Sequence, residues 1–160
     1  STQIEKLKRR HPHIYGDLKV ADEAEVKRNW EQIKLSEGKK SVLGGVPKSL
    51  TAVIKAYRMQ DKAAQVGFEW EKSEDVWLKV QEEMDELHEV MEDPKAPQDR
   101  KIEEFGDVMF SLINYARFNN IAPAQALQKV NNKFKSRFEY IEEKATQPLA
   151  EMSLEAMDAL

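Results

Sequence analysis

A short loop between two apolar stripes constrains the fold of this chain more than any other feature. The loop, residues 92–98, contains Pro94 and Pro97, and apolar residues recur at alternating spacings of three and four on both sides of it. This spacing predicts two amphipathic helices, and so short a loop makes them antiparallel neighbours. We expect both stripes to lie in a packed core. They consist of Trp77, Val80, Met84, Leu87 and Met91, and of Ile102, Phe105, Met109, Leu112 and Ala116.

The rest of the chain also reads as helical. Helical spacing predicts helices over residues 22–36 and 49–65, and Ser73 suits the N-cap of the hairpin's first helix. Pro123 suits the first position of a further helix that runs to about residue 145. Its stripe includes Phe134 and Phe138, which we expect to be core residues, as we do Trp77 and Phe105. No strand pattern is evident, so the predicted fold class is an all-α antiparallel helical bundle.

Composition narrows the kinds of partner. The chain has 160 residues, a formal net charge of −4 and no cysteine. Disulfides and thiolate metal sites are therefore excluded, and a cytoplasmic location is expected. No apolar run approaches the length of a membrane span, and no basic face dominates, so we expect neither a membrane nor a nucleic acid as partner.

Four acidic residues near the hairpin loop have a matched register. Glu83 and Glu86 precede residue 95 by twelve and nine positions, and Glu104 and Asp107 follow it by nine and twelve. Residues at equal distances from an antiparallel turn lie at the same height, and each pair is spaced i,i+3 on one helix flank. The sequence therefore predicts that four carboxylates converge across one helix–helix seam, although a solvated acidic face is the commoner meaning of such a run.

Carboxylates that meet so closely repel one another, and a hard dication removes that conflict. Ligand sets made only of oxygen select magnesium, manganese or calcium over zinc or copper. Magnesium also keeps water ligands and binds substrate phosphates, which suits an exposed seam. We therefore predict a Mg2+ site at Glu83, Glu86, Glu104 and Asp107, with Mn2+ as a substitute.

A pair of cations on the helix after Pro123 offers a phosphate contact. Lys133 and Arg137 are spaced i,i+4, so they share a helix face. Such a pair can bind phosphate oxygens that bridge to a metal. Judged by their spacing alone, Lys133 and Arg137 are more simply interpreted as ordinary surface cations than as phosphate ligands.

Taken together, these segments resemble the MazG family of nucleoside triphosphate pyrophosphohydrolases. The family motif, E-E-x-x-E followed by E-x-x-D, is matched by residues 82–86 and 104–107. Residues 60–70 are similar to the segment that precedes the motif in this family, and residues 131–138 to its N-x-K-F-x-x-R-F segment. The likeness is greatest to the C-terminal domain of two-domain MazG proteins, with residues 11–17 similar to the segment between their domains.

The resemblance implies an all-α homodimer that uses Mg2+ for attack of water at the α-phosphate of a nucleoside triphosphate. Nucleoside monophosphate and pyrophosphate would be the products. By motif position, the four acids would be catalytic residues and metal ligands. Lys133 and Arg137 would hold phosphates, and Asn131 and Lys62 would contact substrate. Residues 1–47 would form a linker and helical appendage, and residues 48–160 the catalytic domain.

Two alternatives stay open. Dimeric dUTPases and phosphoribosyl-ATP pyrophosphohydrolases resemble MazG in their acidic motifs, so a narrower substrate is compatible with the same bundle. A non-catalytic helical scaffold with a vestigial metal site is the other alternative, and the intact set of four acids argues against it.

Overall fold

The computed structural model describes residues 4–5, 25–26, 29, 33 and 41–160. The predicted helix over residues 22–36 lies mostly outside these residues, as does the segment at 11–17. The chain divides into two compact units, residues 1–121 and 122–160, which we describe separately. The expected division between residues 47 and 48 stays a prediction.

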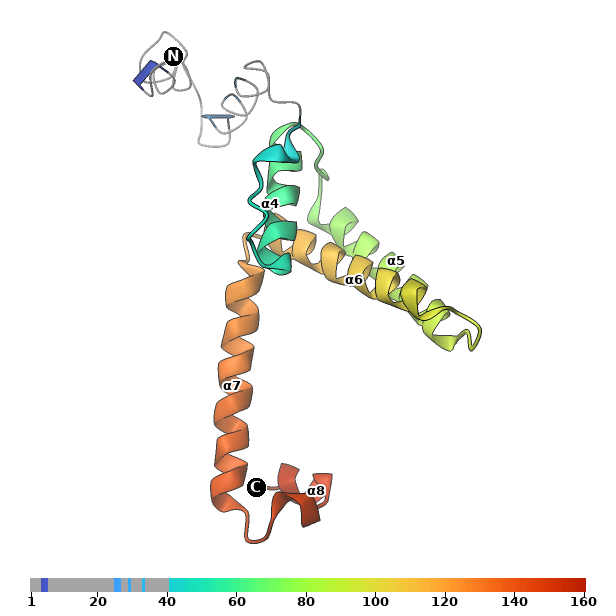
Figure 1. The fold of residues 1–160 in the computed structure, drawn as a ribbon, viewed down its shortest axis with the longest axis vertical. Helices are drawn as coiled ribbons and strands as arrows, with labels where there is room; N and C mark the ends of the chain where they lie inside the picture. Colours follow the sequence, from blue (N-terminus) through green and yellow to red (C-terminus); the bar gives the residue numbers. More distant parts are fainter. Residues whose placement is uncertain (1–3, 6–24, 27–28, 30–32, 34–40) are drawn as a thin grey trace. The chain divides into compact units, whose positions relative to one another are not determined.

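Helices make up all the regular structure of the described residues, so the predicted all-α class is confirmed (Figure 1). In this part of the chain no helix is both long and apolar enough to cross a membrane. The α-helices are α4 (Ala52–Gln65), α5 (Ser73–Glu92), α6 (Gln98–Phe118), α7 (Pro123–Lys144) and α8 (Leu154–Asp158), and two 3-10 turns are η1 (Leu43–Gly45) and η2 (Leu149–Glu151).

The predicted hairpin is present. α5 and α6 lie side by side and antiparallel, joined by the loop of residues 93–97 (Figure 1). The Asp93 side chain accepts a hydrogen bond of 2.9 Å from the backbone N–H of Lys95, which closes the loop as an Asx turn. The hairpin therefore places the two acidic segments on facing helices.

α4 crosses the C-terminal half of α6 (Figure 1). The Gln60 side-chain amide on α4 donates a 2.8 Å hydrogen bond to the backbone carbonyl of Phe110 on α6. α4 ends at Gln65, and Gly67, just beyond its C-cap, has a φ of 92°, in the left-handed region that glycine adopts without a steric cost. This ending turns the chain and leads residues 68–70 back toward α6, since these residues line one pocket with Phe110.

The prediction that both hairpin stripes lie in a packed core is largely wrong for the single chain. Of the two hairpin stripes, only Val80 is fully buried; the buried apolar side chains are Val76, Val80, Val90, Val108 and Ile113. Two antiparallel helices bury only the narrow strip along which they touch, so much of each wider stripe stays on the outside. The stripe residues that remain exposed are Trp77, Met84, Met91, Ile102, Phe105, Met109 and Leu112.

The predicted N-cap at Ser73 is also wrong. Lys72 takes the N-cap position of α5, and Ser73 is the first helical residue. The Ser73 hydroxyl instead donates a 3.1 Å hydrogen bond to the side-chain oxygen of Asn119, just past the end of α6. A contact 46 residues away thus replaces the local capping bond.

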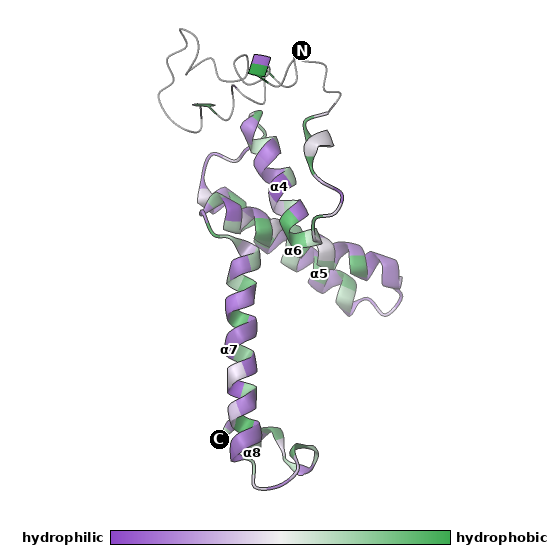
Figure 2. Ribbon diagram, turned by 60° about the vertical axis from the view of Figure 1, so that its left-hand side comes forward, coloured by the Kyte–Doolittle hydropathy of each residue, from purple (hydrophilic) through white to green (hydrophobic). Residues whose placement is uncertain are grey.

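The second unit consists of α7, η2 and α8. Pro123 is the first residue of α7, as predicted, because its fixed φ and missing N–H suit that position. No residue of α7 is buried, and Figure 2 shows hydrophobic positions recurring along its length between hydrophilic ones. Phe134 and Phe138, expected in a core, stack on each other with ring centroids 6.0 Å apart and remain exposed.

Candidate metal centre

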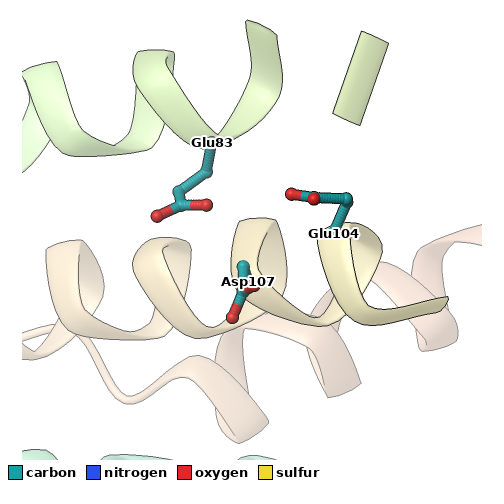
Figure 3. A group of neighbouring side chains, drawn as sticks. All are labelled: Glu83, Glu104 and Asp107. Atoms are coloured by element: carbon teal, nitrogen blue, oxygen red, sulfur yellow. The ribbon is translucent and has the colours of Figure 1, made fainter. Parts of the chain in front are cut away.

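Three carboxylates converge between α5 and α6. Glu83, Glu104 and Asp107 each offer an oxygen atom, and these atoms lie within 4.8 Å of one another. Figure 3 shows Glu83 reaching from α5 toward α6, which carries the other two residues one helical turn apart. Glu83 is buried, Glu104 is half-buried and Asp107 is exposed. The cluster therefore has one anchored side and one side open to solvent.

Lys79 neutralises part of this negative charge. Its ammonium lies 2.8 Å from a Glu83 oxygen and 3.0 Å from Glu82, and the hydrogen bonds to Glu83 and then Glu82 raise the pKa of Lys79. Moving a charged group out of water into a protein interior costs roughly several kcal/mol. A buried carboxylate therefore needs such a partner. Lys79 thus supplies a positive partner for the buried Glu83.

Glu86 lies outside the group of three, although the register places it one turn along α5. Its side chain is exposed. Loss of hydration and the negative charge of Glu83 raise the pKa of Glu86; Lys79 opposes the shift and Glu104 adds to it. Glu86 is therefore within the electrostatic field of the cluster, and its role as fourth ligand stays a prediction.

The donor set fits a hard divalent cation. All three groups are carboxylates, which Mg2+, Mn2+ and Ca2+ prefer, and no nitrogen or sulfur donor belongs to the group. The open side at Asp107 leaves room for water and phosphate oxygens. Arg100, one turn before Glu104 on α6, has its Nε 3.7 Å from a Glu104 oxygen. The arrangement can hold a cation and present it to an anionic ligand.

The other predicted site residues lie on two elements. Lys62 is half-buried in the last turn of α4, in the same unit as the acids. Asn131, Lys133 and Arg137 are exposed on α7 in the second unit. Lys133 and Arg137 line a pocket of about 480 Å³ formed between α7 and the C-terminal residues Met157–Leu160. Their shared face is as predicted, while their contact with substrate stays a prediction.

Sequence reasoning missed two features of the first unit. Lys79 precedes Glu83 by four residues, a spacing that signals an ion pair on a helix and was readable in advance. The second feature is a pocket between α4 and α6, bordered by an ion pair of Glu69 with Arg117 at 2.6 Å. These partners are 48 residues apart, and no local pattern joins them.

Fold and site together define an all-α protein whose helical hairpin carries a cluster of carboxylates that fits a divalent cation. Residues 71–141 match the MazG nucleotide pyrophosphohydrolase domain. A nucleoside triphosphate pyrophosphohydrolase/pyrophosphatase MazG of Thermotoga maritima is 41% identical over 163 aligned positions. A nucleoside triphosphate pyrophosphohydrolase of Escherichia coli K12 is 39% identical over 142, and Bacillus subtilis YabN, named as an uncharacterized protein, is 50% identical over 163.

The chain belongs to the MazG family, and its MazG domain includes the whole hairpin and most of α7. These alignments include 98%, 86% and 98% of this chain, respectively. The chain spans 60% of the Thermotoga relative, 54% of the E. coli relative and 33% of YabN. It therefore corresponds to about half, or less, of these longer proteins.

Proposed function

We propose that this chain hydrolyses nucleoside triphosphates to nucleoside monophosphates and pyrophosphate, with Mg2+ as cofactor. The observation that carries the proposal is the meeting of Glu83, Glu104 and Asp107 within 4.8 Å at an open seam. The names of the Thermotoga and E. coli relatives support the reaction class. A scaffold would have no need of a buried glutamate beside two further carboxylates.

Glu83, Glu104 and Asp107 would hold the cation, with Glu86 as the fourth proposed ligand. When bound, the dication supplies charge neutralisation at the phosphates and acidifies a water molecule. Mn2+ would substitute because it prefers the same oxygen ligands. Glu83 is the anchored ligand, since its burial and its contact with Lys79 restrict its side chain.

A carboxylate beside the cation would accept the proton of the attacking water. Glu86 suits this task better than Glu83, because Glu83 is already engaged by Lys79. The water would attack the α-phosphorus, the bond to the bridging oxygen would break, and pyrophosphate would leave with that oxygen.

Cationic and amide side chains would hold the rest of the substrate. We propose that Lys133 and Arg137 bind phosphate oxygens and stabilise charge on the departing pyrophosphate. Asn131 and Lys62 are further proposed substrate contacts. The expected cytoplasmic location fits an enzyme that acts on the nucleotide pool.

A substrate panel tests the reaction. Each common ribo- and deoxyribonucleoside triphosphate, with dUTP and phosphoribosyl-ATP, would be incubated with the protein and Mg2+, and both products would be separated. Monophosphate and pyrophosphate in equal amounts are expected, and turnover should stop with EDTA and return with Mg2+ or Mn2+. Turnover of dUTP or phosphoribosyl-ATP alone would assign the narrower function. Orthophosphate and diphosphate as products, or no turnover, would refute the proposal.

We also propose that the protein works as a homodimer. Large apolar side chains stay exposed on α5, α6 and α7, including Trp77, Phe105 and Phe134. Groups of large exposed apolar side chains are characteristic of association sites. A second copy of the same chain would cover such surfaces on both partners at once.

A further inference from the structure

The segment between α4 and α5 forms one wall of a pocket. We refer to residues 66–72 as the strap, because they connect the two helices without regular structure of their own. Residues 67–70 line a cavity of about 530 Å³ together with side chains of α4 and α6. Every residue of the strap is nevertheless exposed. The strap therefore bounds a cavity while gaining little stability from packing.

The two aromatic residues of the strap illustrate how poorly it is packed. Phe68 is 83% exposed and Trp70 is 45% exposed. Burial of aromatic side chains is a major source of stability in folded proteins, and the strap leaves most of it unused at Phe68. Segments with few apolar contacts open locally at a much lower free energy than the whole domain unfolds. The strap is such a segment.

Backbone hydrogen bonds hold the two ends of the strap but not its middle. The N–H groups of residues 66–68 donate to carbonyls in the last turn of α4, and the Lys72 carbonyl accepts from the N–H of Val76. Within the described part of the chain, residues 69–71 make no backbone–backbone hydrogen bond. Gly67, near the first end, has a φ of 92° and can change its backbone angles more freely than other residues. The middle of the strap is therefore free to move unless side chains hold it.

One ion pair fixes the middle of the strap to α6. Arg117 Nη2 lies 2.7 Å and 2.6 Å from the two carboxylate oxygens of Glu69, which also accepts a 3.0 Å hydrogen bond from the Trp70 N–H. On α6, the Nε and Nη2 atoms of Arg117 donate to the side-chain oxygen of Asn114 at 3.1 Å and 2.9 Å. The Arg117 side chain is only 9% exposed, so solvent screens this pair less than a surface pair.

We propose that the strap is a gate of the α4–α6 pocket and that the ion pair of Glu69 with Arg117 is its latch. Among the described residues, no other hydrogen bond or ion pair joins residues 66–72 to α6. When the latch breaks, the middle of the strap moves away from α6 and uncovers the pocket. This inference goes beyond the proposed function and does not rest on it, because it concerns access to the cavity, and its tests need no nucleotide.

Limited proteolysis tests the latch. Chymotrypsin cleaves after aromatic residues, and Phe68 and Trp70 are those of the strap. Arg117→Met should raise the cleavage rate after them about tenfold or more, because charge-assisted hydrogen bonds are lost and the rate follows the open population. Glu69→Gln should have the same effect, and the double variant should add little to either. Glu71→Gln removes the same charge two residues further on and is the matched control, with an unchanged rate.

Urea separates local opening from global unfolding on the same samples. Local opening exposes little surface, so cleavage in the strap should depend only weakly on urea below the unfolding transition. Val80→Ala leaves a cavity at a fully buried position of α5 and should lower the midpoint of global unfolding, with strap cleavage unchanged. If Arg117→Met does not fold, Glu69→Gln decides the matter.

Thiol labelling tests access to the pocket itself. The chain has no cysteine, and Ala63 of α4 lines the pocket, so Ala63→Cys introduces a single reporter thiol. A thiol reagent should label this variant about tenfold more slowly than the same variant combined with Glu69→Gln. Equal labelling rates would show that the strap does not control access. Wild-type cleavage rates in Arg117→Met and Glu69→Gln would exclude the latch, and a steep urea dependence would exclude local opening.

Discussion

The α5–α6 hairpin and the α7–α8 unit have similar amphipathic sequences, yet they bury very different parts of them. The hairpin buries valines on both helices and places a glutamate, Glu83, among them. α7 is the longest helix of the described residues and buries no side chain. A hairpin supplies its own neighbour through a five-residue loop, whereas a single long helix has to find one elsewhere.

The comparison teaches that the acidic cluster is built locally, whereas the proposed phosphate contacts come from a separate unit. Glu83, Glu104 and Asp107 meet because two adjacent helices share a register. Lys133 and Arg137 line a pocket with C-terminal residues of their own unit. The predictions below ask how far each region works by itself, from the largest expected effect to the smallest.

Removal of one charge from the acidic cluster should have the largest effect. Asp107→Asn should lower kcat/KM about 1000-fold or more, because the loss of several kcal/mol of charge stabilisation corresponds to that factor. The helices should remain folded, as measured by circular dichroism. Glu103→Gln, on an exposed neighbouring position of α6, is the matched control. Near-wild-type turnover of Asp107→Asn at saturating Mg2+ would count against the whole site.

Glu86 should differ from the three clustered acids. Glu86→Gln should lower kcat about 100-fold, the range of a lost general base, while Mg2+ affinity changes less than it does in Glu83→Gln. Isothermal titration with Mg2+ and steady-state kinetics on the same samples would separate the two roles. If Glu86→Gln and Glu83→Gln weaken Mg2+ binding equally, Glu86 serves only as a metal ligand, and its assignment as the general base is wrong.

A substitution on the apolar face of α7 should weaken dimerisation rather than folding. Phe134→Glu should raise the dimer dissociation constant at least about 30-fold, since an interface aromatic typically contributes about 2 kcal/mol or more. Sedimentation equilibrium would measure this change. Gln125→Glu adds the same charge at an exposed position of α7 and should leave the mass unchanged. A wild type that is monomeric at high concentration would exclude the homodimer.

Replacement of Lys79 should have the smallest effect, and it should strengthen Mg2+ binding rather than weaken it. Lys79→Met removes a cation that competes with the metal for Glu83, so Mg2+ should bind more tightly, by up to about fivefold. Without metal, the melting temperature of the same variant should fall by roughly a few degrees, because Glu83 loses its partner. Lys95→Met, in the hairpin loop, should change neither quantity. Weaker Mg2+ binding in Lys79→Met would show that the lysine supports the site rather than competes for it.

Much of the hairpin was predictable from the sequence. Loop length and apolar spacing predicted α5, α6 and their antiparallel pairing. Counting from residue 95 placed Glu83 level with Asp107 and Glu86 level with Glu104, and three of these four acids, Glu83, Glu104 and Asp107, do meet. These features depend on positions at most 24 residues apart along one simple topology. Helix geometry fixes such relations almost completely.

Tertiary structure decided which apolar residues are buried and which polar partners meet. Trp77 shares a stripe with the buried Val80 yet lies exposed, and Phe105 on the facing helix is exposed as well, because a stripe wider than one helix contact cannot be covered by one neighbour. Glu69 pairs with Arg117, and Gln60 with the Phe110 carbonyl, across 48 and 50 residues. Sequence determined this protein's helices and the register of its acids, since both follow from a local periodicity. The pocket beside them arose only when α4 crossed α6, because the angle of that crossing depends on side-chain packing that no periodicity encodes.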